Sequence, residues 1–443
     1  MQTRFPAHLL TDPATALCET VIRQCVHCGF CTATCPTYVL LGDELDSPRG
    51  RIYLIKEMIE NEQTPSADVV QHIDRCLSCL SCLTTCPSGV NYMHLIDHAR
   101  AYVEAHFRRP LGQRLLRGLL ARTLPYPRRM RAALRLARPF RWLQPVLEKS
   151  TATAPLAAML RLTPKRLPPA APAAGSPAGP ARRGRVLLAQ GCVEGVLAPQ
   201  IRAATLRLLR RAGFEVVMAD GEGCCGALTH HLGREREALA AARRNVDAWR
   251  PEIARGLDAI CLTASGCGTT LKNYGFLLRH EPAYAAQAAA VSALARDLSE
   301  LLAQTGLPPA VGVPPLTVAY LSPCSMQHGQ KITQQPLELL RAAGFRVRLP
   351  AESHLCCGSA GTYNILQPEL AARLGDRKAE HIGRLQPDVL ATGNIGCATQ
   401  MRPRLAVPVV HTVELLDWAT GGPPPAALNT SAAPARISRA ADR

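Results

Sequence analysis

Cysteine spacing constrains this chain more than any other feature of its sequence. Of its 443 residues 18 are cysteine, and eight of these fall in two copies of one short motif. Residues 25–36 read CVHCGFCTATCP and residues 76–87 read CLSCLSCLTTCP, which are both Cys-x2-Cys-x2-Cys-x3-Cys-Pro. This is the spacing of bacterial proteins that bind two [4Fe–4S] clusters. The chain is therefore predicted to be an electron-carrying iron–sulfur protein.

The motif also assigns each cysteine to a cluster. Three cysteines spaced three residues apart can surround one cluster, and the fourth, fixed by the proline after it, binds the other cluster. We expect the first cluster to be bound by Cys25, Cys28, Cys31 and Cys86. We expect the second to be bound by Cys76, Cys79, Cys82 and Cys35. A zinc ribbon is disfavoured, because each run places four cysteines too close together for one tetrahedral site.

A long insert separates the two motifs and has helical character. Ile52, Ile55 and Ile59 recur on one stripe of the segment RGRIYLIKEMIENE, which is the pattern of an amphipathic helix. We therefore predict that residues 1–104 form a mostly helical ferredoxin domain.

Residues 185–420 contain an internal duplication. The segments RVLLAQGC, LLRRAGFEV and GEGCCGA of the first half correspond to TVAYLSPC, LLRAAGFRV and SHLCCGSAG of the second. Each half reads as strand, helix, strand, loop, helix, strand, which is typical of an α/β layer with a mainly parallel sheet. The predicted fold class is thus α plus α/β, with cysteine-rich modules at residues 185–310 and 311–420. Ligand sites of such sheets lie where strands end, as these cysteines do.

Each module offers four cysteines at equivalent positions. They are Cys192, Cys224, Cys225 and Cys267 in the first module, and Cys324, Cys356, Cys357 and Cys397 in the second. Two adjacent cysteines can present both thiolates to a metal from one turn, whereas a disulfide between them is strained. Gly226 and Gly358 follow these pairs and let the backbone approach a bound group. An iron–sulfur centre, a zinc ion and redox-active thiols are the three alternatives for these quartets.

The remaining segments are basic or rich in proline. Residues 105–150 contain eleven arginines interleaved with leucines, which predicts basic amphipathic helices. Such helices can lie on an anionic membrane, hold an acidic partner or cover a domain junction. Nucleic-acid binding is disfavoured, because no aromatic residues for base stacking are interleaved. Within the 105–184 segment, residues 163–184 read as a linker, and residues 421–443 read as a disordered tail.

Other sequence signals limit where the chain works and what it does alone. No secretory signal and no uninterrupted apolar stretch of membrane-spanning length is present, so a cytoplasmic location is expected, with any contact to the inner face of the cytoplasmic membrane being peripheral. No G-x-G-x-x-G fingerprint lies between a strand and a helix. We therefore expect no catalytic residues for substrate oxidation in this chain, and a two-electron oxidation would need a flavin on a partner.

The Cys-x31-Cys-Cys-Gly spacing resembles the cysteine-rich domain of heterodisulfide reductase subunits. The full form of that domain ends in Cys-x2-Cys and supplies five cysteines to a non-cubane [4Fe–4S] cluster. Ala264 and Asn394 stand at the first position of that final pair. Each module therefore keeps four cysteines, which argues against a non-cubane cluster and against a thiol–disulfide enzyme of that type.

Over residues 20–420 the sequence resembles the iron–sulfur subunits of bacterial glycolate oxidase (glycolate dehydrogenase), through CVHCGFCTATCPTYVLLGDELDSPRGRIYLIKEMIE, SHLCCGSAGTYN and LTASGCG. The resemblance implies that the chain passes electrons from two flavoprotein subunits, which oxidise glycolate to glyoxylate, toward a quinone-type acceptor. Related subunits serve lactate and glycerol-3-phosphate oxidation, which are the alternatives. A redox sensor or assembly scaffold is a third, non-enzymatic reading.

Overall fold

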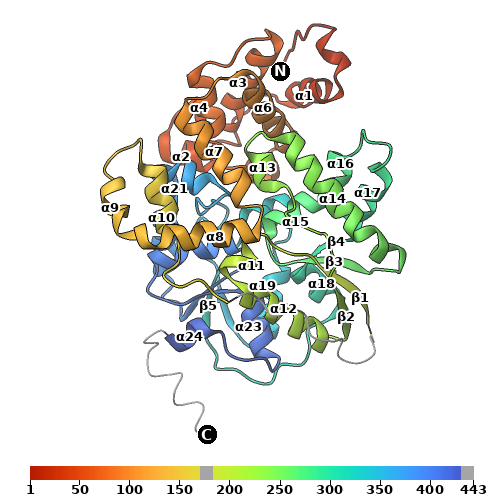
Figure 1. The fold of residues 1–443 in the computed structure, drawn as a ribbon, viewed down its shortest axis with the longest axis vertical. Coiled ribbons are helices and arrows are strands. Elements are labelled where there is room, and N and C mark those ends of the chain that lie inside the picture. The colour runs from red at the N-terminus through yellow and green to blue at the C-terminus, as the bar shows by residue number, and fades with distance from the viewer. Residues whose placement is uncertain (170–182, 431–443) are drawn as a thin grey trace.

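The computed structural model describes residues 1–169 and 183–430. Its N-terminal part is helical, as predicted, and forms one end of the molecule (Figure 1). The helices are α1 (Pro13–Gln24), α2 (Pro36–Leu41), α3 (Pro48–Glu60), α4 (Ala67–Asp74), α5 (Ser81–Thr85) and α6 (Tyr92–His106), with short 3-10 turns at Leu9–Thr11 and Glu44–Asp46. The predicted isoleucine stripe of α3 is buried, and it packs with Leu95 and Ile96 of α6 in one core.

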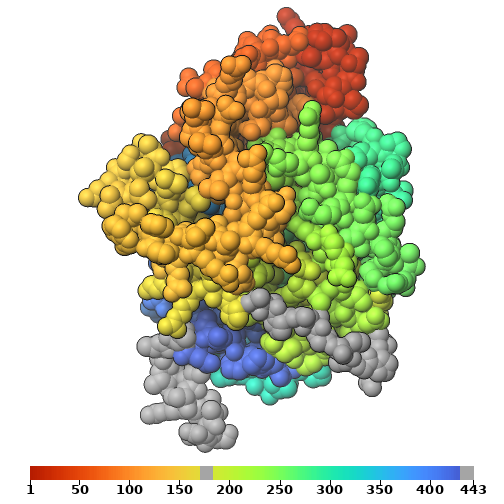
Figure 2. All heavy atoms as spheres, in the orientation of Figure 1, coloured from red at the N-terminus to blue at the C-terminus, as the bar shows by residue number. Residues whose placement is uncertain are grey.

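A second helical segment crosses the face of the molecule. It comprises α7 (Leu111–Thr123), α8 (Pro127–Ala137), a 3-10 stretch η3 (Arg138–Leu143), α9 (Gln144–Leu147) and α10 (Ala154–Leu162). Helix α8 contacts the first module at α11, and α10 contacts the second module at α20 and α21. Figure 2 shows these helices (orange to yellow) covering the face that Figure 1 presents.

The first cysteine-rich module is a four-stranded sheet in the order β2-β1-β3-β4 with helices around it, and every strand pair is parallel. Its strands are β1 (Gly184–Leu188), β2 (Phe214–Val217), β3 (Ala259–Leu262) and β4 (Ala295–Asp297). Its helices are α11 (Glu194–Leu197), α12 (Pro199–Arg211), α13 (Ala227–His231), α14 (Glu235–Ala254), α15 (Ser265–Lys272), α16 (Tyr274–Leu277), α17 (Ala285–Leu294) and α18 (Leu298–Thr305).

The second module repeats this arrangement, with the parallel order β6-β5-β7-β8. Its strands are β5 (Thr317–Leu321), β6 (Arg346–Arg348), β7 (Val389–Thr392) and β8 (Val409–His411). Its helices are a π turn η4 (Ser325–Gly329), α19 (Gln335–Ala342), α20 (Tyr363–Leu366), α21 (Pro368–Gly383), α22 (Ile395–Met401), a 3-10 turn η5 (Arg402–Arg404), α23 (Thr412–Ala419) and α24 (Ala426–Thr430). The predicted α plus α/β class is confirmed.

Equivalent side chains hold equivalent strands in the two modules. Asp258 accepts a hydrogen bond from the backbone N–H of Arg185 at 2.7 Å, and Asp388 accepts one from Thr317 at 2.7 Å. The modules also share one hydrophobic core, to which α12 contributes Leu208 and α23 contributes Leu416. The shared core makes the duplicated half one packed unit, because burying these apolar surfaces together stabilises both modules.

The predicted tail requires a correction. Residues 426–430 form α24, and Leu428 is buried in the core shared by the modules. Pro425 is buried as well, and Ala427 packs against the same core, which the proline- and alanine-rich composition did not indicate. The rest of the predicted tail, residues 431–443, and residues 170–182 of the predicted linker lie outside the described residues.

Candidate iron–sulfur and cysteine sites

The four cysteines predicted to bind the first cluster come together around one hollow. Cys25 follows the last residue of α1, and Cys86 follows α5. Cys28 and Cys31 lie in the loop between α1 and α2, and all four thiols line the same hollow. Cys28 is exposed, and Val26 and Phe30 beside it are 67% and 65% exposed. The structure therefore places this site at the protein surface, under two apolar side chains.

The second predicted set, made by Cys76, Cys79, Cys82 and Cys35, is buried. Burial raises the pKa of the Cys82 thiol, and the neighbouring thiols of Cys79, Cys76 and Cys35 raise it further. The thiol of Cys31, which is predicted to bind the first cluster, raises this pKa as well, and Cys82 also lines the first hollow, so the two predicted sites adjoin. Positive φ angles at Ser78 and Leu80 turn the backbone between these cysteines. The thiol of Cys35 in the first motif acts on those of Cys79 and Cys82 in the second, and the assignment of these cysteines to one cluster stays a prediction.

Two residues that the sequence reasoning missed support this buried group. Arg51 is 1% exposed, and its Nη1 lies 3.8 Å from the Sγ of Cys35. Its Nη2 also donates to Asp46 at 3.0 Å, so the guanidinium is held in place. The hydroxyl of Tyr92 lies 3.9 Å from the Sγ of Cys76. A buried cation and a hydroxyl donor both favour negative charge on nearby sulfur. Arg51 and Tyr92 were not found because each looks like an ordinary helix residue in sequence.

The first module assembles its quartet from three strand ends. Cys192 follows β1, Cys224 and Cys225 follow β2, and Cys267 lies in α15 after β3. The Sγ atoms of Cys192 and Cys224 are 3.5 Å apart, and the hydrogen bond from Cys192 lowers the pKa of Cys224. Asn245 holds this turn, because it accepts from the N–H of Gly223 at 2.8 Å and donates to the carbonyl of Cys224 at 3.1 Å.

The second module repeats the quartet with a charged neighbour. The Sγ atoms of Cys324 and Cys356 are 3.7 Å apart, and those of Cys357 and Cys397 are 3.5 Å apart. Lys378 is 2% exposed and donates to the carbonyl of Glu352. Burial lowers the pKa of Lys378, whereas the thiols of Cys357 and Cys356 raise it. This quartet therefore has an ammonium group beside it.

The sulfur separations fit metal coordination. Two thiolates on one tetrahedral ion with bonds of about 2.3 Å lie roughly 3.8 Å apart. The pairs at 3.5 and 3.7 Å are close to this separation. Buried and half-buried thiols grouped without disulfides are also the donor set that zinc and iron sites use. The sulfur separations therefore suit one tetrahedral ion, zinc or iron, in each module.

All eight module cysteines open onto one cavity of about 320 Å³. Helices α7, α8 and α10 line the opposite side of this cavity with apolar side chains. Leu77 and Ser78 of the helical domain line it as well. The duplication thus presents both quartets to a common space, under a roof of helices.

The buried group of the helical domain adjoins the second module. Cys79 packs in one cluster with Cys356 and Tyr363, and Cys324 packs against that cluster. Burial raises the pKa of Cys79, and the nearby thiol of Cys324 raises it further. The cysteine sites therefore follow one another from the exposed hollow through the buried group to the second module.

The histidines near the modules have structural roles. The Nδ1 of His328 lies 2.7 Å from the hydroxyl of Thr84, and its Nε2 lies 3.0 Å from the carbonyl of His354. His411 joins the modules, with Nε2 2.9 Å from the carbonyl of Thr263. Cys18 and Cys261 are buried, and Cys18 packs in the same core as Cys25 and Cys76. In the parts of the chain described here, no helix is long and apolar enough to cross a membrane.

Two family models match the chain. The 4Fe-4S dicluster domain matches residues 21–90, and the cysteine-rich domain matches residues 186–272 and 318–402. The first match contains both cysteine motifs, and the other two contain the two quartets. The predicted iron–sulfur character and the predicted duplication are therefore confirmed.

Curated relatives match over most of the chain. The glycolate oxidase iron-sulfur subunit of Escherichia coli (strain K12) is 40% identical over 95% of this chain and 99% of its own. The probable glycolate oxidase iron-sulfur subunit of Bacillus subtilis (strain 168) is 32% identical over 91% of this chain and 95% of its own. Lactate utilization protein A of Bacillus licheniformis is 25% identical over 51% of this chain and 96% of its own.

Proposed function

The chain belongs to the family of glycolate oxidase iron–sulfur subunits, and from this membership we propose that it carries electrons away from the oxidation of glycolate to glyoxylate. It is the electron-transfer subunit of an oxidoreductase and leaves substrate oxidation to partner chains. The observation that carries this proposal is the series of cysteine sites, from the exposed Cys28 to Cys79 and then to Cys324.

Two [4Fe–4S] clusters are proposed for the helical domain, with the ligands that the motifs assign. The hollow shared by Cys25, Cys28, Cys31 and Cys86 supports the first cluster. The buried neighbourhood of Cys82, with Arg51 close to Cys35, supports the second. When bound, the clusters supply one-electron steps, so they can split the electron pair of a reduced flavin. Each module quartet is proposed to hold an iron–sulfur centre, and metal analysis showing only zinc there would overturn that part.

Two flavoprotein subunits are proposed as electron donors, docking at the exposed hollow. Val26 and Phe30 stand exposed on either side of Cys28. Exposed apolar side chains at a redox site are typical of a partner interface. A flavin bound by a partner at this place would lie close to the first cluster, which is the one nearest the surface.

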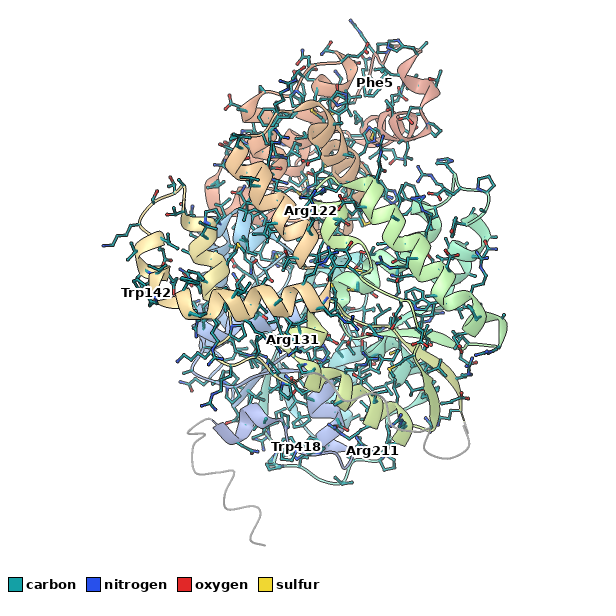
Figure 3. All side chains as sticks on the ribbon, viewed as in Figure 1. Phe5, Arg122, Arg131, Trp142, Arg211 and Trp418 are labelled. Carbon is teal, nitrogen blue, oxygen red and sulfur yellow. The ribbon has the colours of Figure 1, made fainter. Side chains whose placement is uncertain are left out.

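Peripheral contact with the inner face of the cytoplasmic membrane is proposed for the helical segment α7 to α9. Leu111, Leu115 and Leu136 are each 73% exposed there, and Trp142 is 71% exposed. Figure 3 shows Arg122 on α7, Arg131 on α8 and Trp142 on η3 along this segment. Exposed leucines and a tryptophan among arginines suit an anionic lipid surface. Sedimentation of the chain with vesicles of anionic, but not zwitterionic, lipid is the expected result.

The function is tested on the complex purified without oxygen from its own host. Glycolate, D-lactate and glycerol 3-phosphate are added separately, while cluster absorbance and the EPR signal of reduced clusters are followed. Glycolate alone is expected to reduce the clusters rapidly. Reduction by dithionite but by none of the three substrates would overturn the proposed substrate class, and reduction by lactate alone would favour a lactate-oxidising role.

A surface variant tests the donor interface. Phe30→Glu is expected to slow cluster reduction by glycolate at least tenfold, because it places a charge in the apolar contact, while dithionite still reduces every cluster. Leu349→Glu is the matched control, since Leu349 is also exposed (43%) but lies in the second module after β6. Equal rates for both variants would contradict docking at the Cys28 site.

A further inference from the structure

Tyr363 lies at the boundary between the second module and the helical domain. It begins α20, is 5% exposed, and belongs to one packed cluster with Leu77, Cys79 and Cys356. The two parts dock beside it, where α2 contacts α21 (Figure 1) and Arg373 of α21 donates to a backbone carbonyl of α2 at 2.8 Å. A side chain of the second module is therefore buried against the cysteine-bearing loop of the helical domain.

The hydroxyl group of Tyr363 has no hydrogen-bond partner among the residues that the structure describes. A buried hydroxyl without a partner is costly, because it has lost its hydrogen bonds to water. A phenylalanine ring would fill the same space without this cost. The hydroxyl is therefore a polar group that packing alone does not explain.

Groups of the buried cysteine site act on this hydroxyl. Burial raises the pKa of Tyr363, the charge of Arg51 lowers it, and the thiols of Cys76 and Cys356 raise it further. Arg51 and Cys76 belong to the site proposed for the second cluster, since Arg51 lies 3.8 Å from the Sγ of Cys35. The ordinary pKa of tyrosine is already about 10, so a raised pKa keeps the hydroxyl protonated near neutral pH. It therefore remains a hydrogen-bond donor.

The first module uses the equivalent position differently. His231 is the fifth residue after Gly226, as Tyr363 is the fifth residue after Gly358. The Nδ1 of His231 lies 3.6 Å from the Oδ1 of Asp97 on α6. Duplication thus placed a polar side chain at both contacts with the helical domain. In the first module it faces a carboxylate, and in the second it lies beside cysteines.

We propose that the hydroxyl of Tyr363 donates a hydrogen bond to a sulfur of the second cluster and raises the reduction potential of that cluster. The inference rests on the proposed function, because it requires the cluster to be bound by Cys76, Cys79, Cys82 and Cys35. One-electron reduction makes the cluster more negative, and a hydrogen bond to sulfur favours the more negative state. The electron comes from the partner flavin, and the hydroxyl keeps its proton. Docking of the second module thereby tunes a cluster that another domain holds.

The experiment measures the reduction potential of the second cluster in the intact complex. Mediated titration with dithionite sets the solution potential, and EPR follows the signal that Cys79→Ser removes, so glycolate is not needed. Tyr363→Phe keeps the ring and removes only the hydroxyl. Tyr284→Phe is the matched control, because it makes the same change in the first module, where the hydroxyl donates to Asp247 at 3.0 Å. The second readout is pulsed EPR in heavy water, which detects exchangeable protons coupled to the reduced cluster.

At the wild-type midpoint potential, Tyr363→Phe should lower the ratio of reduced to oxidised second cluster at least threefold. This change corresponds to about 28 mV for one electron, since a tenfold change is roughly 59 mV. Tyr363→Phe should also lose an exchangeable proton coupled to the cluster, while Tyr284→Phe changes neither readout. An unchanged ratio, or an equal change in Tyr284→Phe, would overturn the hydrogen bond. Loss of the cluster itself from Tyr363→Phe would show a structural role instead.

The same titration separates this inference from the proposed substrate. A lowered ratio in Tyr363→Phe, in a complex that glycolate fails to reduce, would uphold the role of Tyr363 while the glycolate proposal fails. A wild-type complex without any EPR signal that Cys79→Ser removes would overturn both the second cluster and the hydrogen bond to it.

Discussion

The two cysteine-rich modules share a strand order, a register and a quartet, yet their surroundings differ. The second module packs Cys356 and Tyr363 against Cys79 and Leu77 of the helical domain. The first module meets that domain at other points, including Asn273, whose side chain lies 3.1 Å from the Nε2 of His94. Duplication therefore produced two similar sites, and docking of the helical domain distinguished them. Under the proposed function, the position of each module relative to Cys79, rather than its set of cysteines, would decide its place in electron transfer.

The modules also differ in charge at one equivalent position. Gly226 packs on Ala238 and Gly358 on Ala371, which aligns α14 with α21 and places Asn245 opposite Lys378. Asn245 makes neutral hydrogen bonds to the cysteine turn, whereas Lys378 adds a buried ammonium group. A positive charge favours the reduced, more negative state of a nearby centre. Arg244 acts on Cys224 of the first module, but it is exposed and solvent screens its charge, so the second module should have the higher reduction potential.

Removal of one ligand from each quartet should show the largest difference between the modules. Cys324→Ser is expected to leave the first module oxidised during turnover with glycolate, because the second module lies next to Cys79. Cys192→Ser should leave the second module reducible by glycolate. Freeze-quench EPR of both variants measures which module is reduced. Full reduction of the first module in Cys324→Ser would contradict electron entry through the second module.

Substitution of the glycine after the cysteine pair should destabilise the second module strongly. Gly358 has φ +85°, and a Cβ there would lie 2.6 Å from the carbonyl oxygen of Ala371. Backbone strain and this clash together should lower the free energy of unfolding by about 3 kcal/mol or more. The control is Gly344→Ala, because Gly344 also has positive φ but has no described atom within 4 Å of such a Cβ. Denaturant unfolding and metal content measure both variants, and equal losses would show that φ alone matters.

Removal of the buried ammonium group of Lys378 should change the reduction potential of the second module. Lys378→Met should lower the reduction potential of the second module on the order of 100 mV, which corresponds to a charge interaction on the order of 2–3 kcal/mol. Arg377→Met removes the same charge one residue earlier, but the Arg377 side chain is 38% exposed, so solvent should screen it. Redox titration followed by EPR measures both, and Lys378→Arg should restore the potential. A shift of equal size in Arg377→Met would exclude a local effect.

The smallest expected difference lies at the helix that carries the last cysteine of each quartet. Asn394 caps α22, since it accepts from the N–H of Gly396 at 2.7 Å, while Ala264 occupies this place before α15. Asn394→Ala should lower the free energy of unfolding by about 1 kcal/mol and the melting temperature by about 2 °C. Asn394→Asp keeps the cap acceptor but loses the hydrogen bond that the Asn394 amide donates to the Oγ of Ser265 at 2.7 Å, so it should retain only part of the stability. An unchanged melting temperature in Asn394→Ala would show that the cap contributes nothing.

The sequence identifies sixteen candidate cysteines, which the structure gathers into groups, but it does not identify the residues that surround them. Regular spacing identifies candidate ligands such as Cys28 or Cys356 directly, because a motif is a local property of the chain. Arg51 and Lys378 act across the fold, and nothing in their neighbouring residues indicates it. The short helix at residues 426–430 was missed for the same reason, since the burial of Leu428 depends on a core built from distant segments.

The sequence by itself determined the two cysteine motifs, the duplicated modules and the helical and parallel-sheet classes. These follow from spacing and periodicity, which act over a few residues and need no knowledge of packing. The tertiary structure alone decided that both quartets share one cavity, that α7, α8 and α10 roof it, and that Cys79 adjoins the second module. Those relations join residues hundreds of positions apart, and they arise only when apolar faces are buried against one another.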